Sequence, residues 1–97
     1  MEARYIWDPK KAANNLAKHG VSFDDAVEAF GDPGHVVVEN DDVDGEQRYL
    51  LIGMTRKLVL VVTVFVTFES PHSMNIRIIS ARKAVAYEKS IYEDQNS

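Results

Sequence analysis

The sequence contains no cysteine, only three prolines and five glycines, and no long apolar segment. Without cysteine the chain can form neither disulfide bonds nor thiolate metal sites, and it has no thiol nucleophile. Residues 1–8 lack the apolar stretch of a secretory signal. The longest apolar run, residues 58–68, is too short to cross a bilayer as a helix, which takes ~20 residues. We therefore expect a cytoplasmic protein with no membrane-spanning segment.

Positive charge is missing from one continuous part of the chain. The net charge is −4, but residues 20–47 carry nine acidic residues and neither lysine nor arginine, whereas residues 48–89 carry a net +5. A negative net charge argues against a nucleic-acid-binding domain, which is usually basic. Local charge matters more, however, because screening limits its reach to ~8–10 Å. The acidic segment is either a solvated loop or the surface that meets a basic partner.

The first part of the chain carries signals for two helices. Asp8 followed by Pro9 is a good helix start, and Gly20 is a good helix end. Ser22 is the predicted N-cap of a second helix that ends before residue 31. Within the first of these helices, between Pro9 and Gly20, an apolar stripe at helical spacing is formed by Ala12, Ala13, Leu16 and Ala17.

After residue 35 the pattern changes to strands. Apolar residues then alternate or run together in short stretches separated by turns, and a last helix follows. The 97 residues fit one domain, 1–97, which we expect to be ordered from about residue 3 to residue 93. The predicted fold class is α+β, with two N-terminal helices, a four-stranded, mostly antiparallel meander sheet and a C-terminal helix. The predicted strands are 36–38, 46–53, 58–68 and 75–80, and the last helix is 84–93.

No motif for a metal or a cofactor is present. The three histidines, His19, His35 and His72, do not have metal-ligand spacing, and no glycine-rich phosphate loop follows a strand. We expect neither a metal nor a cofactor.

The arginines of the second half are more informative. Arg77 lies within an apolar strand, where an arginine needs a partner or a ligand. If Ser80 caps the last helix, Arg82 and Lys83 lie in its first turn, where the helix dipole opposes cations unless they hold a phosphate. The alternative is an internal ion pair of Arg77 or Arg82 with Glu46 or Glu88. In one uninterrupted strand Arg77 and Arg82 would lie on opposite faces, because their spacing is odd.

Two sequence blocks resemble the BrnT-like toxins of bacterial type II toxin–antitoxin modules. The first covers residues 7–12 (WDPKKA) and 15–23 (NLAKHGVSF), and the second covers residues 77–84 (RIISARKA), with Glu88 and Tyr92 beyond. Between the two blocks, residues 45–48 (GE, any residue, R) and 52–53 (IG) also fit the family. The resemblance implies a RelE-like ribonuclease fold, RNA as substrate and a BrnA-like ribbon-helix-helix antitoxin, which alone would contact operator DNA. Carried over by motif, the catalytic residues it implies are Lys18, His19, Glu46, Arg48, Arg77 and Arg82.

The chemistry of these side chains fits RNA cleavage without a metal. The 2′-OH attacks the adjacent phosphorus, which takes a base, an acid and cations that stabilise the phosphate. Glu46, His19 or Lys18 can serve as base or acid. His19 and Lys18 can also simply cap the first helix, whose dipole favours cations at its C-terminus. The phosphate would be held by Arg48, Arg77 and Arg82.

One departure from the family pattern leaves alternatives open. The family often has a His and an Arg near the hairpin after the valine-rich strand, but residues 61–70 contain neither. The protein can instead be an inactive, toxin-like module that binds its antitoxin and modulates operator binding, or an RNA- or ligand-binding domain without a partner gene. The long apolar strand can also pair with another chain, so we expect a homodimer.

Overall fold

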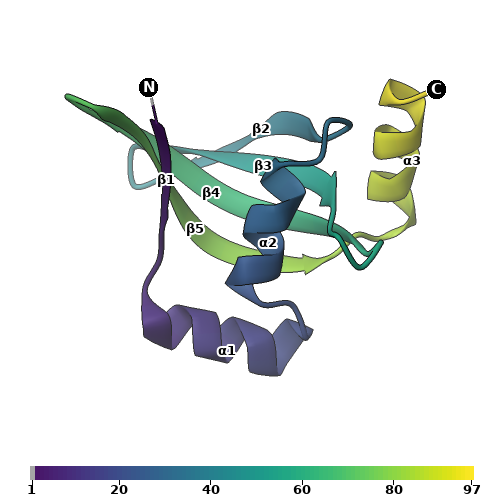
Figure 1. Cartoon of the computed structure of the whole chain (residues 1–97), viewed down its shortest axis with the longest axis horizontal. Coiled ribbons are helices and arrows are strands. Elements are labelled where there is room, and N and C mark those ends of the chain that lie inside the picture. The colour runs from purple at the N-terminus through teal and green to yellow at the C-terminus, as the bar shows by residue number, and fades with distance from the viewer. Residues whose placement is uncertain (1) are drawn as a thin grey trace.

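The computed structural model describes residues 2–97 and has the predicted α+β architecture (Figure 1). Three helices pack on a mixed five-stranded sheet, whose strand order is β1-β5-β4-β3-β2. In chain order the elements are β1 (Glu2–Ile6), α1 (Pro9–His19), α2 (Phe23–Phe30), β2 (Val36–Val43), β3 (Glu46–Met54), β4 (Leu60–Ser70), β5 (Ser73–Lys83) and α3 (Ala86–Gln95).

The first two helices begin and end where the sequence predicts. The Asp8 carboxylate accepts a hydrogen bond from the Lys10 amide at 2.8 Å, and Gly20 ends α1 in the left-handed conformation with φ 71°. The Ser22 hydroxyl accepts from the Asp25 amide at 3.0 Å at the start of α2. Local capping therefore explains both boundaries.

The prediction of four strands was wrong, because the N-terminal residues add a fifth. β1 pairs in parallel with β5, from Glu2 beside Ser73 to Ile6 beside Arg77. The other neighbouring strands are antiparallel, as predicted. A parallel pair between the two ends of the chain leaves no turn signal in the sequence, because its partners are about seventy residues apart.

The predicted end of β5 was also wrong. The strand continues to Lys83, which lies beside Val61 of β4, and α3 begins only at Ala86 with Val85 as its N-cap. Ser80 is therefore not a helix cap, and Arg82 and Lys83 lie in a strand rather than in the first turn of a helix. Ladder bonds to the central strand β4 outweigh the capping preference of Ser80.

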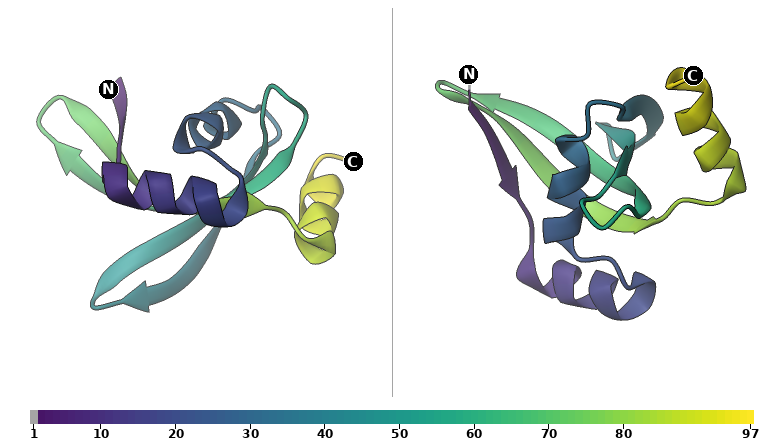
Figure 2. Two further views of the ribbon diagram at one scale, coloured as in Figure 1. Left: turned by 90° about the horizontal axis from the view of Figure 1, so that it is seen from below. Right: turned by 45° about the vertical axis from the view of Figure 1, so that its right-hand side comes forward.

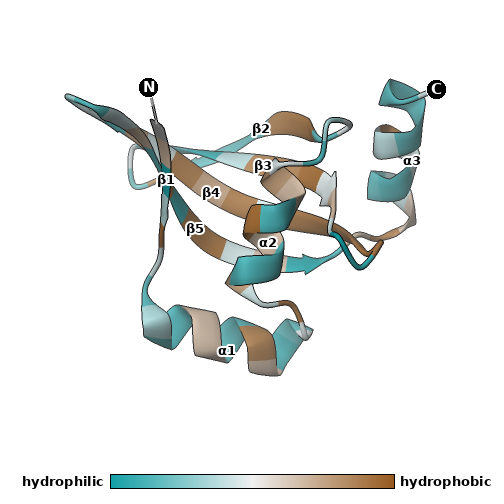
Figure 3. Cartoon of the chain, in the orientation of Figure 1, coloured by the Kyte–Doolittle hydropathy of each residue, from teal (hydrophilic) through white to brown (hydrophobic). Residues whose placement is uncertain are grey.

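The helices divide the sheet into a covered face and a partly open face (Figure 2). On the covered face α2 packs its buried Phe23, Ala26 and Ala29 against the sheet. On the other face Ile91 and Tyr92 of α3 pack over Ile52, Val62 and Ala84, near the C-terminal end of β5. The strands are hydrophilic at the β2–β3 and β4–β5 hairpins and more apolar elsewhere, including where β3 ends and β4 begins (Figure 3).

Asn15 fixes α1 at the outer edge of β5. Its side-chain amide donates to the Ala81 carbonyl at 2.8 Å and accepts from the Ala81 amide at 3.1 Å, so it replaces a strand neighbour beyond the end of β1. It also donates to the Val21 carbonyl at 3.0 Å. Asn15 is 7% exposed, whereas Leu16 of the predicted apolar stripe is 50% exposed. A polar residue, not the leucine, is thus the main buried contact of this helix.

Candidate nucleic-acid interface

A β-bulge brings Arg77 and Arg82 to the same face of the sheet. Val66 of β4 pairs with Arg77 and Val62 pairs with Arg82, and these valines are four residues apart on one strand. The expectation of opposite faces fails because Ile79 is an extra residue in β5, between the pairs Val64–Ser80 and Phe65–Ile78. The two arginines therefore share the face on which α3 packs.

Residues of three strands make up the uncovered part of this face, which we call the open face. On β3, Glu46 and Arg48 lie on the same face as Leu50, which packs near α3, because side chains two residues apart on a strand point to the same side. The open face is defined by Glu46 and Arg48 of β3, Phe68 of β4, and Arg77, Ser80 and Arg82 of β5.

Arg77 reaches across β4 to Glu46. Its Nη2 atom lies 2.9 Å from both Glu46 Oε1 and Oε2, and each side chain is 44% exposed. Val66, which lies beside Arg77 on the intervening strand, is only 2% exposed. Glu46 is one of the two carboxylates expected as a partner of Arg77. The pair places a carboxylate in direct contact with a cation on the open face.

Arg82 forms a two-pronged ion pair with Glu88 of α3. Both its Nη1–Oε1 and Nη2–Oε2 distances are 2.7 Å, and Glu88 Oε1 also accepts from the Val85 amide at 2.9 Å. The hydrogen bond from Arg82 lowers the pKa of Glu88, and the bond to Glu88 raises the pKa of Arg82. The Glu88 side chain is 11% exposed, whereas the Arg82 side chain is 42% exposed and remains in contact with solvent.

Arg48 has no ion-pair partner among residues 3–97, whose side chains the structure describes. Its Nε atom is buried and makes no hydrogen bond there, although the residue as a whole is partly exposed. An unsatisfied buried donor is unfavourable, typically by ~1–3 kcal/mol. A ligand can therefore bind Arg48 without first breaking an ion pair among the described residues, whereas Arg77 and Arg82 are each already paired with a carboxylate.

Lys18 and His19 lie at the edge of β5 rather than on the open face. They line a shallow groove between α1 and the β5 bulge, together with Lys11, Asn14, Asn15, Ile79 and Ser80. Ser80 also belongs to the open face, so it joins the groove to the arginines. The structure thus divides the six predicted residues into two adjacent parts, one on the sheet face and one at its edge.

Two residues of this region were absent from the predicted site. Glu88 orients Arg82, and its capping position three residues after Val85 was the available signal. Lys11 lies in the groove with Lys18, seven residues later on the same helix face. The spacing of the two lysines could have indicated a shared face, but nothing in the sequence showed what that face meets.

A second polar network ties α3 to the rest of the fold. The Asp32 carboxylate accepts from the Tyr92 hydroxyl at 2.6 Å, the Met54 amide at 2.8 Å and the Gly34 amide at 2.9 Å. Burial acts to raise the pKa of Asp32, but these hydrogen bonds together lower it. The hydrogen bond to Asp32 raises the pKa of Tyr92 to about 12. This network anchors α3, and through it the partner of Arg82.

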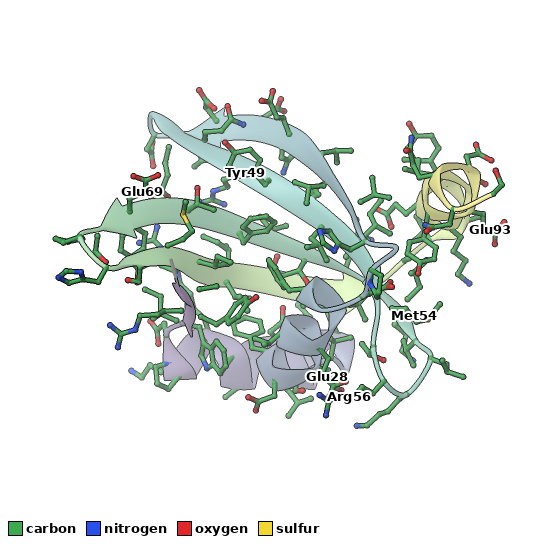
Figure 4. All side chains as sticks on the ribbon, turned by 45° about the horizontal axis from the view of Figure 1, so that its top comes forward. Glu28, Tyr49, Met54, Arg56, Glu69 and Glu93 are labelled. Carbon is green, nitrogen blue, oxygen red and sulfur yellow. The ribbon has the colours of Figure 1, made fainter. Side chains whose placement is uncertain are left out.

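The acidic segment serves two different purposes. Its α2 part is structural: Glu28 accepts from the Arg56 amide at 3.0 Å, and Asp25 lies 3.5 Å from Lys57. Figure 4 shows Glu28 and Arg56 close together near Met54. Four further acids of the segment, Glu39, Asp41, Asp42 and Asp44, lie exposed on the β2–β3 hairpin. Like Asp24 of α2, these hairpin acids are exposed and in no ion pair among residues 3–97, and only on the hairpin are four such acids gathered in that part of the chain.

The groups that could hold a metal are limited. Among the side chains of residues 3–97, no three of His, Asp or Glu lie close enough together to bind an ion. No helix in that part of the chain has the length and apolar character that crossing a membrane requires.

Comparison with known proteins identifies the class to which this fold and site belong. Residues 7–88 match the model of the family described as "Ribonuclease toxin, BrnT, of type II toxin-antitoxin system", and the chain belongs to this family. A crystal structure of the Brucella abortus ribonuclease toxin BrnT is similar, with a TM-score of 0.64 and 26% identity. The alignment covers 88% of this chain and 99% of the Brucella chain. No curated protein sequence matches.

Proposed function

We propose that this protein is the toxin of a type II toxin–antitoxin system and cleaves RNA without a metal ion. The observation that carries the proposal is the gathering of Arg48, Arg77 and Arg82 on one open sheet face, with the Glu46 carboxylate in contact with Arg77. Membership in a family of ribonuclease toxins supports it.

The geometry suggests which residues bind the phosphate and which act as base and acid. Arg48, which has no ion-pair partner among the described residues, binds the phosphate first. The negative phosphate then competes with Glu46 for Arg77, and release of Glu46 leaves a carboxylate able to take the proton of the 2′-OH. Lys18 or His19, at the adjacent edge, supplies a proton to the leaving 5′ oxygen. The attack forms a bond between O2′ and phosphorus and breaks the bond to O5′, which yields a 2′,3′-cyclic phosphate.

Product chemistry and metal dependence test this proposal. Purified protein is incubated with RNA in the presence of a chelator, and the fragment ends are determined. We expect cleavage to persist and the 5′ fragments to end in 2′,3′-cyclic phosphate. Arg77→Ala and Arg82→Ala should each lower the rate by about 10²-fold or more, as removal of transition-state hydrogen-bond donors does. A folded wild-type protein that leaves RNA intact would rule out the proposal.

One observation favours a second candidate function. Both Arg77 and Arg82 are neutralised by carboxylates within the chain, and residues 61–70 contain no histidine or arginine. The protein would then be an inactive, toxin-like module that only binds its antitoxin and modulates operator binding. Co-purification with the antitoxin, no RNA cleavage and no effect on growth would favour this function over the first.

The proposed partner is a ribbon-helix-helix antitoxin, which alone would contact operator DNA, and the proposed location is the cytoplasm. The exposed acids of the β2–β3 hairpin support a docking surface for a basic segment of that antitoxin, because opposite charges attract across an interface. A short ribbon-helix-helix reading frame next to this gene would support both toxin functions and would exclude a solitary RNA-binding domain.

The homodimer stays a prediction. Val61, Val62, Phe65 and Val66 of the long apolar strand are buried within the chain, which leaves Phe68 as its large exposed residue at 45%. Light scattering over a range of concentrations tests it, and a constant monomer mass would exclude it.

A further inference from the structure

Phe68 is an exposed aromatic side chain on an open face whose other residues are polar or charged. We propose that Phe68 is a stacking platform for one base of the single-stranded RNA whose phosphates bind Arg77 and Arg48. This inference rests on the proposed function, and it adds that the substrate is unpaired at the cleavage site. Nothing in the family match assigns a role to this residue.

The register of the strands places Phe68 beside Arg77. Phe68 pairs with Asn75, and Val66, two residues earlier on β4, pairs with Arg77, so both aromatic and cation lie on the open face. Two residues along a strand span ~7 Å. That separation is comparable to the reach from a base to the phosphate of its own nucleotide. A base on Phe68 thus brings its phosphate to Arg77.

The backbone around Phe68 is held in place by polar side chains. The Asn75 amide donates to the Phe68 carbonyl and to Ser70 Oγ, both at 3.2 Å, and Ser70 Oγ lies 2.6 Å from Ser73 Oγ. The ladder between β3 and β4 ends at Tyr49 and Phe65, so no ladder partner on β3 lies beside Phe68. Figure 4 shows Glu69, the next residue, at the end of the β4–β5 hairpin far from α3. The result is a strand backbone held in place at the base of an aromatic side chain that stays open to solvent.

The chemistry around the ring favours a base over a second copy of the chain. A two-fold copy seated on Phe68 would bury the neighbouring Arg77–Glu46 pair against an identical pair, and desolvating such charges is costly. A nucleotide supplies a flat apolar ring for Phe68 and an anionic phosphate for the arginines, so it satisfies both groups. Stacking is also tolerant of sequence, because every base has a π-face.

Tryptophan fluorescence tests the contact directly. The probe is a single-stranded 2′-O-methyl RNA, which keeps bases and phosphates but lacks the nucleophile, so that binding is measured without cleavage. We expect this RNA to quench the added emission of Phe68→Trp. The control is Tyr87→Trp on α3, where the native side chain is 75% exposed. Its emission should not change beyond that of the native Trp7, which every variant contains.

Affinity measurements separate stacking from simple apolar contact. Phe68→Leu keeps an apolar residue and should bind the RNA on the order of tenfold more weakly, whereas Phe68→Tyr should bind like the wild type. Unquenched Phe68→Trp and unweakened Phe68→Leu, with RNA still bound, would overturn the inference and leave the proposed function standing. Wild type that binds no RNA would overturn both. A Phe68→Leu protein that loses a dimer but keeps RNA affinity would assign the residue to an interface between copies.

Discussion

Arg82 and Glu88 join β5 to the first turn of α3 through two parallel hydrogen bonds of 2.7 Å. Glu88 also caps the helix through the Val85 amide, so one carboxylate fixes the helix start and the direction of the arginine. The α3 helix is thereby linked to the proposed RNA site, although α3 carries none of the predicted catalytic residues.

We predict that Glu88→Gln loosens Arg82 and destabilises the fold modestly. The substitution removes the charge but keeps the shape, and a cost of about 1 kcal/mol is expected because the Arg82 side chain is partly exposed, which weakens the ion pair through solvent screening. The pKa of Glu88 is lowered in the folded state, so its contribution is present above the ordinary carboxyl pKa of ~4.3 and is lost as the pH falls through the folded pKa. Urea unfolding at pH 7 and pH 3 measures this, and an equal effect of Glu88→Gln at both pH values would contradict it.

We predict that Tyr92→Phe weakens the anchoring of α3. The lost hydrogen bond to Asp32 should lower the unfolding free energy by about 1–2 kcal/mol. The pKa of Tyr92 is raised to about 12, so this stabilisation is complete below the ordinary tyrosine pKa of ~10 and is lost as the pH rises towards that raised value. Absorbance of tyrosinate follows the titration. Tyr87→Phe, at an exposed position of the same helix, is the control and should leave stability unchanged.

We predict that Lys11 contacts a phosphate of bound RNA in the groove beside Lys18. Each phosphate contact adds about 0.7 to the slope of log affinity against log salt for a single strand. Lys11→Gln should therefore lower that slope by about 0.7 with 2′-O-methyl RNA. The control is Lys10→Gln, one residue earlier on the helix and not among the residues that line the groove. An equal decrease of the salt slope in both variants would mean that the RNA senses only the overall positive charge of α1, with no specific contact at Lys11.

We predict that the hairpin acids bind the antitoxin. Asp41→Asn, Asp42→Asn and Asp44→Asn combined should weaken the complex, and the difference from wild type should grow as the salt concentration is lowered. Titration calorimetry at two salt concentrations measures this. Asp24→Asn, an exposed acid on α2, is a control for net charge, and unchanged affinity of the triple variant would make the hairpin a solvated loop.

Much of the fold and part of the site followed from local signals. The boundaries of α1 and α2 were correct because Asp8, Gly20 and Ser22 act within a few residues of themselves. The internal ion pairs were expected as one alternative, and the structure shows Arg77 with Glu46 and Arg82 with Glu88. The burial of Asn15 was missed, because its partner Ala81 is 66 residues away and no helical spacing reports it.

The sequence by itself determined the class: capped helices, alternating strands, a basic second half and two family blocks are readable from neighbouring residues. Only the tertiary structure decided which cations share a face. The extra residue Ile79 shifts the alternation of β5, and the pairing of Val62 and Val66 with Arg82 and Arg77 fixes the result. Alternation is a local rule, but a bulge is set by how one strand registers against another, and that registration depends on contacts far along the chain.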